Sequence, residues 1–224
     1  MNDPHLFHPF SIEDGTLLDL SESPHPTVVR GARGCTTTLP GNETHYGIVV
    51  DGEVAISDDH GTLNLGAGMF FCVPGPAAID ATVGAALCIG RVGTHAMRQF
   101  GGPIESYGRL RYIDGCTDTL LVCPGRLGEP CLNHLHIPPG TRQSRHTHPS
   151  ELIGVILRGR GECRTPSGTW ALEPGMAWRI PTGCLHSFFT TDHSLDVIAW
   201  HPDSDFGPTD EDHPMRNRTL LERA

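Results

Sequence analysis

The chain has 224 residues, enough for one large or two small domains, and a hydrophobic content of 38% that is ordinary for a folded protein. Its formal net charge of −10 argues against nucleic acid and anionic membranes as partners, because an acidic surface repels phosphate groups. The 27 glycines and 19 prolines are spread along the chain, which favours short strands joined by tight turns over disorder. We therefore predict an all-β protein.

The first segment, residues 1–24, is expected to be an N-terminal arm. It opens MNDPHLFHPF, which has neither the basic nor the apolar part of a signal peptide. No apolar run in the sequence is long enough to cross a bilayer. The eight cysteines include no CxxC pair, so we expect them to be mostly small buried residues in a reducing, cytoplasmic environment.

A repeat organises the rest of the chain. Tyr46–Gly52 is similar to Ile153–Gly159, and Leu65–Pro74 is similar to Leu172–Pro181. Both pairs are separated by the same offset of 107 residues, from Tyr46 to Ile153 and from Leu65 to Leu172. Two matches at one offset predict two copies of a domain of about a hundred residues.

The repeat and the turn residues set the expected boundaries. We place the first β domain at residues 25–94 and the second at 112–204. Residues 95–111 have little strand character and are expected to be a linker. The polar tail, residues 205–224, either packs on the second domain or is solvated.

The second domain contains a histidine pattern typical of a metal site. His146 and His148 are two positions apart, so on a strand they share one face. His186 follows a turn formed by Pro181 and Gly183, which can return the chain over the same cavity. Three imidazole nitrogens suit Fe, Mn, Ni, Cu or Zn and do not suit Mg or Ca. We predict one divalent transition metal ion on these three histidines.

The two stretches resemble the paired cupin motifs, G(x)5HxH(x)3–4E(x)6G and G(x)5PxG(x)2H(x)3N. The matching residues are, for the first motif, Gly140, His146, His148 and Gly159, and, for the second, Gly175, Pro181, Gly183 and His186, with Thr190 where Asn is usual. The resemblance implies two tandem cupin barrels of the double-stranded β-helix or jelly-roll type, a bicupin. It also implies that the metal site lies in the second barrel.

The first domain departs from the pattern. At the offset of 107 residues, Leu39, Gly41 and Ile79 stand where the second domain has its three histidines, and His45 replaces Leu152. We therefore expect no metal in the first domain, and a role as scaffold, oligomer surface or second ligand pocket.

The acidic ligand of the first motif is also missing, because Leu152 occupies its position and Glu151 comes one residue early. Strand alternation puts Leu152 on the histidine face and Glu151 on the other, unless a bulge turns Glu151 inward. Glu151 is therefore one candidate for a fourth ligand. Gln143 is another, because it comes shortly before His146 and has a side-chain oxygen that could reach the metal, but the interpretation as a loop residue is favoured.

His134 and His136 alternate on the strand before the first motif. Both are candidates for catalytic groups beside the metal, as general acids or bases that do not bind it. The alternative is that they are ordinary hydrogen-bonded or exposed histidines, because one strand alone does not say which face is inside.

A site of three histidines resembles the three-histidine iron cupins, which include gentisate-type, thiol and β-diketone dioxygenases. The resemblance implies a non-haem Fe(II) dioxygenase acting on a small anionic chelating organic substrate, with Mn, Ni, Zn or Cu as other metals. The alternatives are a metal-dependent isomerase, decarboxylase or lyase, and a cupin that binds a small molecule without turnover. We also expect a homodimer, because small barrels with open strand edges tend to cover those edges.

Overall fold

The computed structural model describes residues 5–222 of the chain. The first four residues of the expected arm and the last two of the expected tail lie outside this range. The described residues form strands and two short 3-10 turns, η1 (Ile113–Gly115) and η2 (Arg216–Arg218), without an α-helix. The all-β prediction is therefore confirmed. No helix in the described part of the chain is long and apolar enough to span a membrane.

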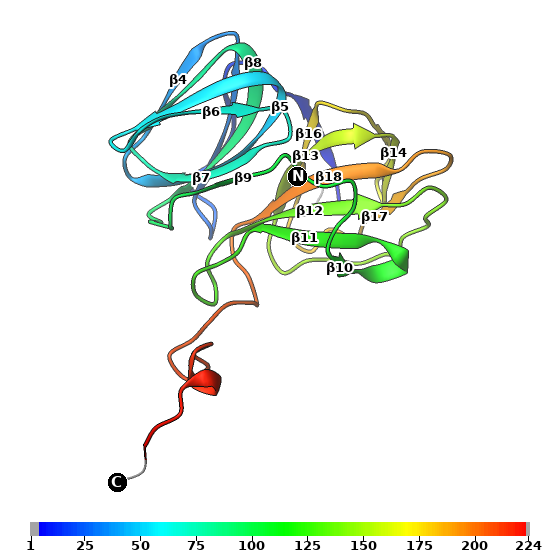
Figure 1. Ribbon diagram of the computed structural model, residues 1–224. Coiled ribbons are helices and arrows are strands. Elements are labelled where there is room, and N and C mark those ends of the chain that lie inside the picture. Colours follow the sequence, from blue (N-terminus) through cyan, green and yellow to red (C-terminus); the bar gives the residue numbers. More distant parts are fainter. Residues whose placement is uncertain (1–4, 223–224) are drawn as a thin grey trace.

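The strands form two β units that lie side by side (Figure 1). The strands of the first unit are β2 (Gly15–Leu20), β3 (Thr27–Arg33), β4 (Thr36–Leu39), β5 (Glu43–Asp58), β6 (Gly61–Gly66), β7 (Phe70–Pro74), β8 (Ala77–Val92) and β9 (Gln99–Gly101). The strands of the second unit are β1 (His8–Ser11), β10 (Leu110–Arg111), β11 (Thr117–Val122), β12 (Cys131–Ile137), β13 (Leu152–Gly159), β14 (Gly161–Thr165), β15 (Gly168–Leu172), β16 (Met176–Ile180), β17 (Ser187–Phe189) and β18 (Leu195–His201).

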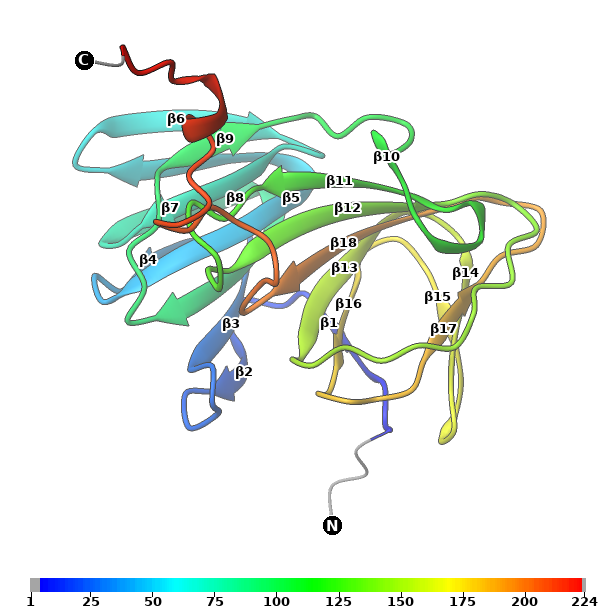
Figure 2. The same cartoon turned by 90° about the horizontal axis from the view of Figure 1, so that it is seen from below.

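The two units repeat one strand order. The first has the order β2-β3-β8-β5-β7-β9, and the second has β11-β12-β18-β13-β16-β1, with β10 added beside β11. A separate three-stranded sheet, β15-β14-β17, faces the larger sheet of the second unit (Figure 2). The long strand β5 corresponds to both β13 and β14, which are separated at Arg160 between Gly159 and Gly161. The sequence repeat is thus visible as a repeated topology.

The segments outside the repeat also contribute strands. β1, within the expected arm, pairs with β16 at the edge of the second unit, whereas β2 pairs with β3 in the first. Within the expected linker, β9 extends the first unit and β10 extends the second. The arm and the linker therefore cover sheet edges, which otherwise expose unpaired backbone groups. The boundaries placed from the sequence remain a proposal.

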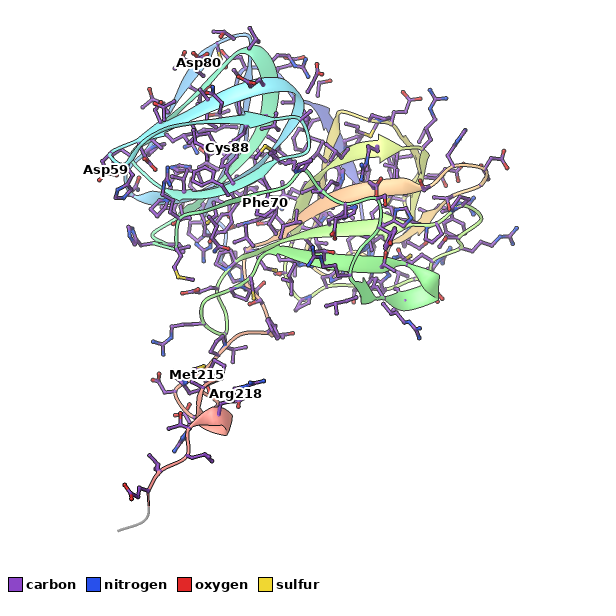
Figure 3. All side chains as sticks on the ribbon, viewed as in Figure 1. Asp59, Phe70, Asp80, Cys88, Met215 and Arg218 are labelled. Carbon is purple, nitrogen blue, oxygen red and sulfur yellow. The ribbon has the colours of Figure 1, made fainter. Side chains whose placement is uncertain are left out.

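Three apolar cores hold the molecule together, one inside each unit and one between them. The core between the units joins residues of both, and the rings of Tyr46 and Trp200 lie 6.0 Å apart there. Phe70 packs against the same core from the first unit (Figure 3). β13 is buried on both faces, with Ile153 turned toward the first unit and Leu152 toward the interior of the second. The first unit therefore packs against the outer face of β13, whose inner face lines the interior of the second unit.

The C-terminal segment leaves the second unit and extends away from both (Figure 1). It contains η2, with Met215 and Arg218 labelled in Figure 3. Arg126 and Asp210 form an exposed ion pair at 3.4 Å near its start. Exposed pairs contribute little to stability, and most residues from 205 to 222 are themselves exposed to solvent.

Candidate metal centre

The three predicted ligands come together on two chain segments that pair with each other. His146 and His186 form an antiparallel bridge and exchange both backbone hydrogen bonds, at 3.0 and 2.9 Å. The backbone N–H of Gly183 donates to the carbonyl of His148 at 3.0 Å, which ties the second ligand to the same turn. Gly183 has a φ of +68°, a conformation that favours glycine. The Pro-x-Gly spacing therefore places the third histidine opposite the first.

The imidazole nitrogens of the three histidines converge. One nitrogen from each lies within 4.8 Å of the others, and in the described part of the chain this is the one such group of metal-binding side chains. The ring centroids of His146 and His186 are 4.5 Å apart, and the ring centroid of His148 lies 5.1 Å from that of His146 and 5.3 Å from that of His186. The spacing predicted from the sequence therefore produces a compact group of nitrogen donors.

Backbone carbonyls fix the orientation of two of these rings. Nδ1 of His146 lies 2.8 Å from the carbonyl oxygen of Ser144, and Nδ1 of His186 lies 2.9 Å from that of Cys184. Because a carbonyl only accepts, Nδ1 carries the hydrogen in each ring and Nε2 keeps its lone pair. Metal-binding histidines are commonly oriented in this way.

The surroundings of His148 and His186 favour the neutral form of both rings. The pKa of His148 is lowered to about 3, mainly by burial and to a smaller extent by the neighbouring histidines. Burial also lowers the pKa of His186 to about 4, against the opposing effect of its hydrogen bond to Cys184. Neutral imidazoles are the form that binds metals. The donor set therefore fits a borderline transition metal ion such as Fe, Mn, Ni, Cu or Zn.

The histidines line a cavity of about 310 Å³ in the second unit. Its other lining residues are Leu110, Arg111, Tyr112, Asp118, Asn133, Leu135, Leu152, Trp178, Phe188, Val197, Ala199 and His201. The walls are mostly apolar, and Arg111 and Asp118 are the charged side chains among them. Such a cavity suits a small organic molecule that is held by a few polar groups.

A short strap closes one side of this cavity. Leu110, Arg111 and Tyr112 line the cavity immediately before η1. Within η1, the carboxylate of Asp114 accepts hydrogen bonds from the backbone N–H and the hydroxyl of Ser144, at 2.6 and 3.2 Å. Since Ser144 also accepts the hydrogen bond of His146, the strap is tied directly to the loop that presents this ligand.

The side chains of Leu152, the first residue of β13, and of Glu151, just before it, have different surroundings. Leu152 lines the cavity with the histidines, whereas the carboxylate of Glu151 accepts a hydrogen bond from Nε of Arg179 at 2.8 Å. Glu151 is thus paired with a cation outside the histidine group. Gln143 is occupied as well, because its Oε1 accepts the backbone N–H of Phe188 at 3.1 Å.

We predict that Glu151→Gln leaves the metal content at one ion per chain, because the carboxylate is directed to Arg179 and not to the histidines. Elemental analysis of the purified variant measures this. Loss of most of the metal from a variant that still folds would show that Glu151 is a ligand after all.

The structure does not bring His134 and His136 to the cavity, contrary to the sequence-based expectation. On β12 it is Asn133 and Leu135 that line the cavity, so the two histidines face the other side of the sheet. There both rings bond to Oδ1 of Asp196, His134 at 2.8 Å and His136 at 2.9 Å. These are the hydrogen-bonded histidines of the alternative interpretation.

Sequence reasoning did not identify the other polar residues of the cavity, which include His201, Asp118 and Asn133. The ring of His201 lies 5.4 Å from that of His148, and its pKa is lowered to about 4 by burial. Val197, Ala199 and His201 alternate along β18 and all line the cavity. This alternation was the signal in the sequence that could have identified His201.

The corresponding positions in the first unit are filled by apolar packing. Leu39 and Ile79 are fully buried in the core of that unit. A Cβ on Gly41 would approach Pro76 to 3.3 Å, so little space is left there. Nε2 of His45 lies 3.0 Å from the carbonyl oxygen of Pro40. The described residues of the first unit thus offer no group of three ligands.

Comparison with known families supports the fold. Residues 133–200 match the model of the cupin domain family. This segment extends from β12 into β18 and includes all three histidines. No curated protein matches the chain.

Solved structures with the same fold cover most of the chain. A cupin 2 conserved barrel domain protein from Leptotrichia buccalis has a TM-score of 0.61 at 12% identity, over 90% of this chain and 91% of its own. A salicylate 1,2-dioxygenase from Pseudaminobacter salicylatoxidans has a TM-score of 0.64 at 12% identity, over 90% and 85%. The oxalate decarboxylase of Bacillus subtilis, a protein with Mn(II) centres, has a TM-score of 0.54 at 12% identity, over 89% and 78%. These similarities establish a cupin-like jelly-roll fold.

Proposed function

We propose that this chain is a metal-dependent enzyme of the cupin type that holds one divalent transition metal ion on His146, His148 and His186. The observation that carries the proposal is the convergence of three histidine nitrogens at one cavity, with Nδ1 of His146 and His186 fixed by carbonyls. We further propose that the two β units are two cupin barrels, that the second alone binds metal, and that the chain forms a homodimer.

The reaction we propose is the oxygenation of a small anionic organic molecule, with Fe(II) as the metal and Mn, Ni, Zn or Cu as alternatives. When bound, Fe(II) supplies the redox chemistry by which non-haem enzymes use O2. Three neutral ligands leave the metal charge uncompensated, which favours an anionic ligand. Arg111 in the cavity wall adds its positive charge to that of the metal ion.

The residues around the histidines bind and shield the substrate. Leu135, Leu152 and Phe188 give the cavity an apolar wall that excludes water from the substrate. The indole Nε1 of Trp178, which also lines the cavity, is buried without a hydrogen-bond partner in the structure. An unpartnered donor of this kind can orient a polar group of the substrate.

The likeness to a salicylate 1,2-dioxygenase is a likeness of fold, and one fold hosts many chemistries. It supports oxygenation only as a reaction that this architecture accommodates. The oxalate decarboxylase supports a non-oxidative reaction in the same limited way. The choice between them depends on whether oxygen is consumed.

The test is oxygen uptake by protein purified anaerobically, loaded with Fe(II), and supplied with a panel of small carboxylates that carry a second oxygen donor. We expect one metal ion per chain and oxygen consumption with at least one compound, and neither in His146→Ala. If a compound is converted and no O2 is taken up, the proposed dioxygenase activity would be replaced by that of a decarboxylase, isomerase or lyase. Binding of compounds without any turnover would instead make the chain a binding protein.

A further inference from the structure

Two polar side chains form a separate group in the wall of the cavity. Asp118 lies on β11 and Asn133 on the neighbouring strand β12, and both line the cavity together with the three histidines. Nδ2 of Asn133 donates a hydrogen bond to Oδ1 of Asp118 at 3.1 Å. Asp118 pairs in register with Leu135, another residue of the cavity wall. The amide thus holds the carboxylate at the cavity surface.

The other end of the Asn133 amide has no partner. Its Oδ1 is buried and accepts no hydrogen bond from the part of the chain that the structure describes. A buried acceptor without a partner is costly, so native proteins rarely retain one without a function or a bound molecule. A ligand that places a hydroxyl or amine beside this pair would supply the missing donor.

The surroundings of Asp118 make it an unusual carboxylate. Burial raises its pKa to about 6, against the opposing effects of the Asn133 hydrogen bond and of His134. Several charged or titratable side chains surround Asp118. Arg111 of β10 and the adjacent Tyr112 lie on one side, and Cys131 and His134 come from β12. From the rest of the cavity come His146, His148, His186 and His201. Among the described residues the ion pairs of arginine are with carboxylates other than Asp118, so Asp118 remains available as a base.

We propose that Asp118, positioned by Asn133, is the group that accepts a proton from a hydroxyl of the substrate in this cavity. The inference rests on the proposed function, because the substrate must occupy the histidine-lined cavity. In the step, the substrate O–H bond breaks, its electron pair stays on the substrate oxygen, and a new O–H bond forms on the Asp118 carboxylate. A base whose pKa lies near the working pH is the most effective for such a transfer.

The positions of Asp118 and Asn133 also restrict which substrates can bind in the cavity. One part of the molecule must be a donor for the metal, and another must be a neutral hydroxyl that reaches Asp118 and Asn133. The apolar walls and the volume of about 310 Å³ favour a compact, largely apolar body between these groups. The substrate class is therefore a small hydroxylated compound with a second oxygen donor, and a fully ionised polyacid is disfavoured.

The experiment measures proton release on binding of catechol, a hydroxylated chelator, to protein loaded with Zn(II), which has no redox chemistry. Titration calorimetry at neutral pH in buffers of different ionisation enthalpy counts the protons given to the buffer. In the native protein one proton is kept by Asp118, whose pKa is raised further by the oxyanion beside it. We expect Asp118→Asn to release about one more proton per catechol than the native protein.

The matched control is Asp59→Asn, because Asp59 lies on the first unit far from the second (Figure 3) and its side chain is 86% exposed. It should release as many protons as the native protein. Equal release by the native protein and Asp118→Asn, with catechol bound to both, would overturn the role of Asp118. Full zinc content without any catechol binding would overturn the inferred substrate class, whereas a lack of bound zinc would overturn the proposed function on which the inference rests. If Asp118→Asn does not fold, Asp118→Ser makes the same comparison.

Discussion

Replacement of His186 by alanine is expected to lower the affinity of the protein for Zn(II) or Fe(II) by more than about 100-fold, because loss of residues that merely orient a ligand already costs 10- to 100-fold. His186 is the most buried of the three histidines, so water does not easily take its place. Competition with a chromophoric chelator measures the affinity, and elemental analysis should find almost no metal in the purified variant.

The control for this variant is His60→Ala, because the His60 side chain is 68% exposed on the first unit. It should keep the native affinity and one ion per chain. An unfolding curve for each variant separates loss of a ligand from loss of the fold, since the His186 backbone pairs with His146. Near-native metal affinity in a folded His186→Ala protein would remove this histidine from the site.

Replacement of Asp118 by asparagine is expected to raise the free energy of unfolding of the metal-free protein by about 1–3 kcal/mol at about pH 8. A shift of one pKa unit corresponds to about 1.36 kcal/mol, and the expected range is lowered because the side chain is partly solvated. The side chain keeps its shape, and its amide oxygen can still accept the hydrogen bond of Asn133. The substitution removes the negative charge of a partly buried carboxylate, which is costly to desolvate. Stabilisation by removing a functional group is a common sign of a site that trades stability for activity.

The pH dependence of this effect follows from the direction of the shift. The pKa of Asp118 is raised from 3.8 to about 6 in the folded protein, so the folded state holds this proton more tightly than the unfolded chain. The stability contributed by the protonated group is fully present below the unfolded pKa and is lost as the pH rises through about 6. Urea unfolding at about pH 3 should therefore show little difference between variant and native protein. A variant that is less stable at about pH 8 would contradict the account.

The sequence was sufficient for the parts of the fold that depend on local spacing. Turn glycines and the offset of 107 residues, as from Tyr46 to Ile153, predicted the all-β class and the repeat. The spacing from His146 to His148 predicted that both would share a face. Counting alternation from His148 placed Leu152 with the histidines and Glu151 away from them, and the structure agrees, although Pro149 and Ser150 form a bend and β13 begins only at Leu152.

The parts that depend on pairing between distant segments could not be predicted. The parity of β12 alone does not reveal which face is inside, so His134 could be named only as a candidate for the cavity, and Asn133 was overlooked. Asp118 meets Asn133 only through the register of β11 against β12. The pairing of β1 with β16 joins residues that are far apart in the sequence, such as Ser11 and Met176, and no local pattern indicates it.

The central claim is that three histidines of the second unit hold one metal ion. The most direct measurement is a crystal structure of protein loaded anaerobically with Fe(II). We predict one ion per chain, bonded to nitrogens of His146, His148 and His186 at about 2.0–2.2 Å, with no carboxylate of the chain among its ligands. An ion bonded to Glu151 or Asp118, or an ion held in the first unit, would contradict the account.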